Sequence, residues 1–333
     1  MKRLEHYWYT RSPWLILLTP FSLLYSLAVR VRRLLYRIGV LPSERLPVPV
    51  IVVGNLTAGG TGKTPLTGWL AMMLKQAGYR PGIVARGYRG QAKHWPQQVR
   101  PDSDPVMVGD EAVMLARLCD SPMAVGPRRV QAARDLLKHH ECDLILSDDG
   151  LQHYALQRDV DIVVIDGVRR MGNGFCLPAG PLREPASRLK KADLRVVNGL
   201  GNKDEYPMRM KAVSAHNLAD DNDVRELKSF RGSSVHAVAG IGNPQRFLDF
   251  LRQAGLRVEV HLFPDHHAYT EKDVDFGDDR PVLMTAKDAV KCRDFGLRNA
   301  WYVPVTIEMG ADFTERLLEL LQEGTASTKI SAH

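Results

Sequence analysis

Past Pro47 the chain alternates short apolar runs with longer stretches whose apolar residues recur at helical spacing. Four of the apolar runs predict buried parallel strands, at residues 48–53, 143–147, 161–166 and 194–198. The stretches 65–78 and 111–119 have the apolar spacing of helices. Because strands alternate with helices, we expect an α/β fold built on a doubly wound parallel sheet.

A second, shorter series of the same kind begins at residue 233. Apolar runs predict strands at 233–241, 257–263, 281–286 and 301–305, and residues 243–255 predict a helix. This rhythm predicts a smaller α/β domain over 233–325. The first domain is then expected over 41–215, with the polar stretch 216–232 as the linker between the two.

The amino-terminal segment differs from the rest in composition. Residues 12–29 carry no charge and contain Pro20, whereas basic residues flank this run on both sides: Lys2, Arg3, Arg11, Arg30, Arg32, Arg33 and Arg37. A secretory signal would need a better cleavage site than Leu27-Ala28-Val29 offers. A spanning helix needs about 20 apolar residues, and this run is shorter.

Basic residues favour the cytoplasmic side of a membrane. Because both flanks are basic, we expect residues 1–40 to form a helical segment that associates with a cytoplasmic membrane face without crossing it. Anionic lipids of that membrane face would bind its arginines. The alternative is an ordinary buried helix pair.

Overall composition excludes a disordered chain and limits the partners. The 333 residues are 44% hydrophobic and 25% charged, which suffices for a substantial core. The formal net charge of +7 favours anionic partners such as phosphates, acidic lipids or nucleic acid. The cysteines form neither a C-x-x-C pair nor a dense framework, which predicts reduced thiols in the cytosol: Cys119, Cys142, Cys176 and Cys292.

The stretch GNLTAGGTGKTP, residues 54–65, follows a predicted strand and opens a predicted helix. It nearly matches the phosphate-loop template G-x-x-x-x-G-K-[ST], except that Thr57 stands where the template has its first glycine. Glycines let the backbone wrap around phosphates, the lysine can reach the β- and γ-phosphates, and the following hydroxyl can ligate Mg²⁺. The expected phosphate-binding residues are Thr57, Ala58, Gly59, Gly60, Thr61, Gly62, Lys63 and Thr64.

A pair of acids supports this interpretation. The run DLILSDDG ends a predicted strand with Asp148 and Asp149, where a P-loop enzyme keeps its Mg²⁺-binding carboxylate. Two acids at a strand end can also be a turn or a helix cap. Beside a phosphate loop, we expect them to form a metal site with Thr64.

Nucleotide binding alone does not separate a switch from a kinase. A guanine-specific switch carries N-K-x-D or T-K-x-D, and the stretches NKDE (202–205) and TAKD (285–288) both miss that pattern. A kinase needs a base for the acceptor hydroxyl and cations for the transferred phosphoryl group. The candidates are the acids of VGDE, the histidines of FPDHHAYT and the arginines of ARGYRG, GPRRV and GPLREP. Each alone is also typical of a helix cap, a loop or a solvated surface.

The motifs together carry a resemblance. In chain order they are GNLTAGGTGKTP, ARGYRG, VGDE, SDDGLQH, GNGFCLPAGPLREP, AGIGNPQRF, FPDHHAYT and TAKDAVKC. From about residue 7 to about residue 305 the chain resembles the tetraacyldisaccharide 4′-kinase (lipid A 4′-kinase) family, whose own phosphate loop lacks the same glycine. The resemblance implies a two-domain P-loop kinase with a membrane-associated amino-terminal helix. It also implies transfer of the γ-phosphate of ATP, with Mg²⁺, to the 4′-hydroxyl of a tetraacylated glucosamine disaccharide 1-phosphate.

The resemblance also implies roles for single residues. The phosphate lysine falls on Lys63, and the metal ligands fall on Thr64, Asp148 and Asp149, with Glu111 nearby. The remaining roles are a catalytic base, a histidine that supports it, a functional pair in the PLREP motif and one further arginine. The base falls on Asp110, and the histidine that supports it is His266 or His267. The functional pair is Arg183 and Glu184, and the further arginine matches Arg128 or Arg129 only loosely.

Two other functions stay open at this point. One is a nucleotide-hydrolysing switch, such as a metallochaperone-type GTPase. The other is a non-enzymatic, nucleotide-sensing membrane adaptor. On the kinase hypothesis the second domain closes over the nucleotide and excludes water, and no nucleic acid partner is expected. The acyl-chain preference, the oligomeric state and the depth of membrane insertion are not predicted.

Overall fold

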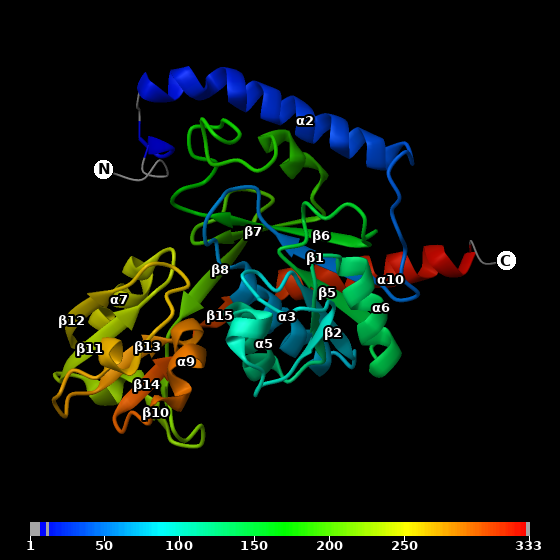
Figure 1. The fold of residues 1–333 in the computed structure, drawn as a ribbon. Coiled ribbons are helices and arrows are strands. Elements are labelled where there is room, and N and C mark those ends of the chain that lie inside the picture. Colours follow the sequence, from blue (N-terminus) through cyan, green and yellow to red (C-terminus); the bar gives the residue numbers. More distant parts are fainter. Residues whose placement is uncertain (1–6, 11–12, 331–333) are drawn as a thin grey trace.

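The computed structural model describes residues 7–10 and 13–330, which fold around two separate β-sheets (Figure 1). The larger sheet has the strand order β15-β8-β7-β6-β1-β5-β2-β4-β3. Its strands are β1 (Val50–Gly54), β2 (Pro81–Ala85), β3 (Gln97–Val99), β4 (Met123–Val125), β5 (Leu144–Asp148), β6 (Val160–Asp166), β7 (Leu194–Asn198), β8 (Tyr206–Lys211) and β15 (Thr306–Met309). The edge strands β3 and β15 pair antiparallel, and the strands between them run parallel.

Helices cover both faces of this sheet, and alternate residues of each strand point to opposite faces. Ile51 and Val53 pack with α3 (Lys63–Gln76), α5 (Asp110–Cys119) and α10 (Ala311–Ile330). Val50 and Val52 pack on the other side with α6 (Arg129–His139), close to η2 (Ala186–Lys191). The short helix α4 (Pro105–Val108) precedes α5. Burial on both faces explains why the central strands are apolar throughout.

The smaller sheet has the order β10-β9-β14-β13-β11-β12. It consists of β9 (Ser214–Asn217), β10 (Val224–Glu226), β11 (Ser234–Ala239), β12 (Arg257–Leu262), β13 (Val282–Thr285) and β14 (Ala300–Val303). One face packs against η3 (Leu227–Phe230) and α7 (Pro244–Gln253). The other packs against α8 (Glu271–Val274), α9 (Ala286–Cys292) and η4 (Arg293–Phe295). The predicted doubly wound parallel sheet with a second, smaller α/β domain is confirmed.

The boundary between the two lobes differs from the prediction. Two short crossings join the sheets, at residues 212–213 between β8 and β9 and at 304–305 between β14 and β15. The expected linker 216–232 is therefore wrong, because its residues form parts of β9, β10 and η3 within the second lobe. All three residues of the edge strand β10 are exposed, which explains the polar composition of this stretch. The end of the chain, expected in the second domain, returns to the first lobe as β15 and α10.

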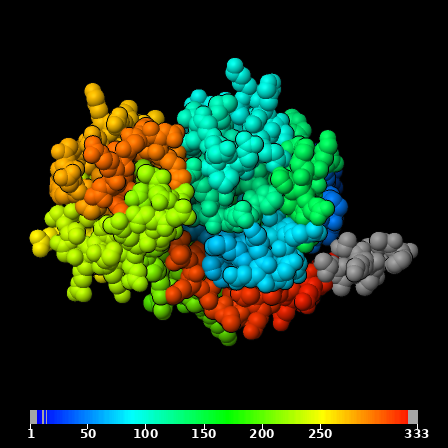
Figure 2. Space-filling model, turned by 90° about the horizontal axis from the view of Figure 1, so that it is seen from below, coloured from blue at the N-terminus to red at the C-terminus, as the bar shows by residue number. Residues whose placement is uncertain are grey.

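The two crossings lie side by side. Lys211 of β8 pairs with Thr306 of β15, and His216 of β9 pairs with Tyr302 of β14. The chain thus passes from one lobe to the other as a two-stranded ribbon. Figure 2 shows the two lobes in contact, with the red carboxyl-terminal helix along the larger one.

The amino-terminal segment forms η1 (Pro13–Leu18) and α2 (Thr19–Arg37), which lies along one side of the larger lobe (Figure 1). Pro20 stands in the first turn of α2, where proline is tolerated. The helix is anchored by Ser22 Oγ, which donates to the Cys176 carbonyl at 2.6 Å. Lys2, Arg3 and Arg11, expected to flank this segment, lie outside the described residues.

Most apolar side chains of this segment face outward. Residues 15–37 are long and apolar enough to cross a membrane, and only 11% of the most apolar window is buried in the protein. The exposed apolar residues are Ile16, Leu17, Phe21, Leu23, Leu24, Leu27, Val31 and Leu34. This exposure disfavours the alternative of an ordinary buried helix pair.

Candidate active site

The phosphate-binding loop joins β1 to α3. Gly62 precedes the helix with φ of 98°, a left-handed conformation that favours glycine. Asn55 shapes the start of the loop, since its Nδ2 donates to the Thr57 carbonyl at 2.7 Å. The hydroxyl of Thr61 is buried and has no hydrogen-bond partner among the residues that the structure describes. Helix α3 begins at Lys63, so its free amide groups provide an anion-binding position.

Thr57 occupies the place where the template has glycine. Its φ is not positive. Its backbone forms an antiparallel bridge with Leu182, and the Ala58 amide donates to the Pro181 carbonyl at 2.7 Å. A β-carbon is strained only where the backbone is left-handed or crowded, so threonine fits at this position. The missing glycine leaves the loop intact.

Asp148 ends β5 beneath the start of α3. Its two carboxylate oxygens accept hydrogen bonds from Thr64 Oγ1 at 3.1 Å and from Thr67 Oγ1 at 2.9 Å. Burial, together with the charges of Glu111 and Asp149, raises the pKa of Asp148 to about 6. Within the described part of the chain no lysine or arginine forms an ion pair with this carboxylate. A hydroxyl beside a carboxylate that lacks such an ion pair is an oxygen set that suits Mg²⁺.

Asp149, by contrast, is surrounded by cations. Its carboxylate lies 3.7 Å from Lys63 Nζ and 3.0 Å from Arg183 Nη1. Burial alone would raise the pKa of Asp149, but the charges of Lys63 and Arg183 outweigh it, and the pKa falls below its ordinary value. Buried Arg129 donates to the Asp149 carbonyl at 3.4 Å, whereas Arg128 is exposed. Of the two arginines that sequence left open, the structure brings Arg129 to the site.

The PLREP motif connects three parts of the molecule. The Arg183 amide donates to the Leu56 carbonyl at 2.6 Å, which ties the motif to the phosphate loop. The hydroxyl of Tyr25, on α2, donates to the Arg183 carbonyl at 3.1 Å. Glu184 is buried and accepts hydrogen bonds from Gln152 Nε2 and from the Tyr154 hydroxyl. This motif therefore joins the amino-terminal helix to the phosphate-binding loop.

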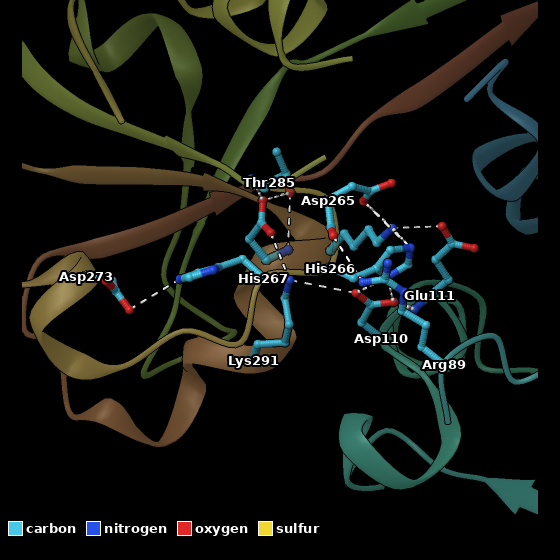
Figure 3. A network of polar contacts seen from close by, with 12 residues as sticks. Arg89, Asp110, Glu111, Asp265, His266, His267, Asp273, Thr285 and Lys291 are labelled. Carbon is cyan, nitrogen blue, oxygen red and sulfur yellow. Dashed lines mark hydrogen bonds and ion pairs between the residues drawn. The ribbon is translucent and has the colours of Figure 1, made fainter. Parts of the chain in front are cut away.

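Asp110 begins α5, where the helix dipole favours a carboxylate. Gly109 before it has φ of 97°, and a β-carbon there would lie 2.9 Å from the Tyr88 carbonyl. The Asp110 carboxylate lies 2.9 Å from Nδ1 of His266, which comes from the second lobe (Figure 3). Burial alone would raise the pKa of Asp110. The hydrogen bond to His266 and the charge of Lys287 outweigh it, so this pKa lies below its ordinary value.

The neighbouring His267 points away from Asp110 (Figure 3). Its Nε2 lies 3.4 Å from Asp273, and its ring packs against Phe263 and Tyr269. The sequence leaves the choice between the two histidines open, whereas the structure brings His266 alone of this pair to Asp110.

Glu111 lies between the two groups of residues. Its carboxylate accepts a hydrogen bond from Lys287 Nζ at 2.9 Å, and its charge contributes to the raised pKa of Asp148. Sequence reasoning missed Lys287 and Lys291. Both belong to TAKDAVKC, and the spacing of four that places them on one face of α9 was the available signal.

The arrangement can hold a polyphosphate and Mg²⁺ on one side and can accept a proton from a hydroxyl on the other. A P-loop, a buried acid at the adjacent strand end and a carboxylate–histidine pair define the class of P-loop phosphotransferases. Three comparisons identify the family within that class.

The family model described as Tetraacyldisaccharide-1-P 4′-kinase matches residues 14–322. The chain is 54% identical to the tetraacyldisaccharide 4′-kinase of Nitrosococcus oceani, over 95% of this chain and 94% of that protein. It is 50% identical to the enzyme of the same name from Methylobacillus flagellatus, over 96% of this chain and 95% of that protein. The chain therefore belongs to the tetraacyldisaccharide 4′-kinase family, as its motifs predicted.

A solved structure agrees with this assignment. The crystal structure of "apo" form LpxK from Aquifex aeolicus in complex with ATP has a TM-score of 0.79 and 28% sequence identity. The similarity covers 93% of this chain and 99% of that chain. The two lobes and the amino-terminal helix are thus parts of the fold of this family.

Proposed function

We propose that this protein is the ATP-dependent kinase that phosphorylates the 4′-hydroxyl of a tetraacylated glucosamine disaccharide 1-phosphate in lipid A biosynthesis. The observation that carries the proposal is family membership across nearly the whole chain. Two features of the site support it. The first lobe carries the phosphate loop with Lys63, and Asp110 of that lobe pairs with His266 of the second.

Residues of the first lobe bind the nucleotide. Lys63 contacts the β- and γ-phosphates, the loop amides from Thr57 to Thr64 surround them, and Arg183 and Arg129 stabilise the negative charge. Thr64, Asp148 and Asp149 would hold Mg²⁺, with Glu111 nearby. When bound, the metal neutralises charge on the phosphate oxygens.

Asp110 is the base in this proposal. The 4′-hydroxyl oxygen attacks the γ-phosphorus, the bond from that phosphorus to the β–γ bridging oxygen breaks, and ADP leaves. The hydroxyl proton passes to the Asp110 carboxylate, while His266 orients that carboxylate by a hydrogen bond. The lowered pKa of Asp110 keeps it ionised, and therefore able to accept a proton, at neutral pH.

The amino-terminal helix holds the enzyme at its lipid substrate. Its exposed apolar side chains enter the interface of the bacterial inner membrane on the cytoplasmic face, and its arginines bind anionic headgroups. The hydrogen bond from Tyr25 of this helix to the PLREP motif, which is itself tied to the phosphate loop, supports this role. The 4′-hydroxyl of the disaccharide then reaches the site while the acyl chains of the same molecule stay in the membrane.

The experiment is mass spectrometry of the acyl disaccharide 1-phosphate after incubation with the purified full chain, ATP and Mg²⁺. Addition of one phosphoryl group at the 4′ position is expected, and no addition by Lys63→Ala. An unmodified lipid in the presence of folded wild-type protein that binds ATP would overturn the proposal. GTP hydrolysis without lipid would instead favour a switch, and nucleotide binding without turnover would favour an adaptor.

A further inference from the structure

Helix α9 of the second lobe carries two lysines that face the Asp110–His266 pair. Lys287 and Lys291 stand four residues apart, so they lie on the same side of the helix. Their side chains are only 11% and 12% exposed. Buried lysines are rare unless they are paired, so these two have a structural reason to be there.

Lys287 has three partners for its three N–H donors. Nζ lies 2.9 Å from Glu111 of the first lobe and 3.1 Å from Asp265 of the second. The third contact is Nε2 of His266, at 3.3 Å. Lys287 thereby joins the start of α5 to the loop after β12. Its three partners, Glu111, Asp265 and His266, are labelled in Figure 3.

The contact with Nε2 favours one position for the proton of the His266 ring, because the other group near this nitrogen, Asp265 Oδ1, lies 3.7 Å away, beyond hydrogen-bond distance. An ammonium group has no acceptor, so Nε2 must offer its lone pair to Lys287. The neutral ring then carries its proton on Nδ1, and that nitrogen lies 2.9 Å from the Asp110 carboxylate. In this tautomer His266 donates to Asp110. In the other tautomer the lone pair of Nδ1 would face the oxygen lone pairs of Asp110, and the hydrogen bond between the two residues would be lost.

Lys291 acts on the carboxylate itself. Its Nζ lies 3.7 Å from Asp110 and 3.1 Å from Asp288, a residue with no exposed surface. Asp288 in turn accepts from the Gly240 amide at 2.9 Å, at the end of β11. The ammonium group also lies 4.8 Å from the centre of the Tyr269 ring. Lys291 is therefore held in place by the core of the second lobe.

We infer that Lys287 and Lys291 are positioning residues for phosphoryl transfer. Lys287 fixes the Nδ1–H tautomer of His266, and Lys291 fixes the Asp110 carboxylate, so the base is fully aligned only when α9 is seated against α5. Arg89 of the first lobe adds another contact between the two lobes, since its Nη1 donates to the Asp265 carbonyl at 3.3 Å. The inference rests on the proposed roles of Asp110 and His266.

The first test is kinetic, on the full chain with the acyl disaccharide, ATP and Mg²⁺. Lys287→Met keeps the length of the side chain and removes its charge and its donors. We expect kcat to fall about 10–100-fold, because a displaced catalytic group costs that much. The KM for ATP should change less than about twofold, because the contact is not with the nucleotide. Lys287→Arg, which keeps charge and donors, should recover part of kcat.

The matched control is Lys272→Met, since Lys272 is an exposed lysine of the same lobe, on α8. It should keep the wild-type kcat, and thermal unfolding shows whether each variant is folded. Lys291→Met should lower kcat with the same unchanged KM. Wild-type kcat in folded Lys287→Met and Lys291→Met would overturn the inference while leaving the kinase function standing. Absence of activity in the wild type would instead overturn the proposed function.

The second test needs no active variant. Long-range ¹H–¹⁵N correlation of the histidine rings in the wild-type protein distinguishes the two tautomers, and comparison with His266→Gln assigns the signals. We expect a protonated Nδ1 and an unprotonated Nε2 for His266, and a mixture of tautomers in Lys287→Met. A wild-type ring protonated on Nε2 alone would overturn the inference even if the lysine variants failed to fold.

Discussion

Three glycines of the phosphate loop differ in what an added methyl group would meet, which allows the loop geometry to be tested one factor at a time. Apart from its two chain neighbours, no described residue has an atom within 4 Å of a β-carbon built on Gly60, and its φ is not in the left-handed region. Gly59 has the same free space but φ of 101°. Gly62 combines φ of 98° with three neighbouring side-chain atoms at 3.2 Å, from Asn198, Met208 and Met210.

The magnitudes follow from these differences. Gly59→Ala should lower the free energy of unfolding by about 1–2 kcal/mol, the cost of a β-carbon in the left-handed region. Gly62→Ala adds overpacking, which costs typically about 1–3 kcal/mol and least where flexible methionines can move. The expected total for Gly62→Ala is about 2–5 kcal/mol. Gly60→Ala should be neutral or stabilise by a few tenths to about 1 kcal/mol, because alanine restricts the unfolded chain.

The assay is urea-induced unfolding of the nucleotide-free protein, so that contacts with ATP do not enter the result. Isothermal titration with ATP and Mg²⁺ then measures affinity, which should fall most for Gly62→Ala, because this residue sets the start of α3. If Gly62→Ala and Gly60→Ala were equally stable, the assignment of strain and crowding to Gly62 would be wrong.

Three further outcomes follow from the site. Asp148→Asn should stabilise the metal-free protein above pH 6 and abolish transfer. Because the folded-state pKa of Asp148 is raised to about 6, its ionisation destabilises the fold between the unfolded pKa, about 4, and about 6, and the cost stays constant above that pH. The gain in the variant should therefore be complete above pH 6 and disappear as pH falls below about 4 in unfolding curves. Asp110→Ala should lower kcat far more than ATP affinity, and adding His266→Ala should change little more, since the two act as one unit in steady-state kinetics. Removal of residues 1–37 should release the protein from sedimented vesicles containing anionic lipid, and full retention would place the anchor elsewhere.

The sequence by itself determined the architecture and the nucleotide side of the site. Buried parallel strands are apolar on both faces, so β1, β5, β6 and β7 are visible as continuous runs. The phosphate loop is equally visible, because its glycines, lysine and threonine are adjacent in the chain and act through local backbone geometry. The eight ordered motifs were enough to predict the family.

Sequence did not reveal how the second lobe is connected. The stretch 216–232 is polar because β10 is an exposed edge strand, and exposed residues carry no pattern that separates a strand from a linker. The return of residues 306–309 to the first sheet depends on pairing with β8, almost 100 residues earlier in the chain. Pairing over such a separation is set by tertiary packing and leaves no local signal.

The base side of the site was likewise decided only by tertiary structure. His266 and His267 are adjacent and chemically identical, and a left-handed φ of 62° at His266 is what turns one ring to Asp110 and leaves the other near Asp273. Lys287 is 176 residues from Glu111 in sequence, yet their charged groups are 2.9 Å apart. A hydrogen bond between side chains requires that donor and acceptor lie within a few tenths of an ångström of about 2.9 Å. No local sequence pattern determines such distances between two lobes.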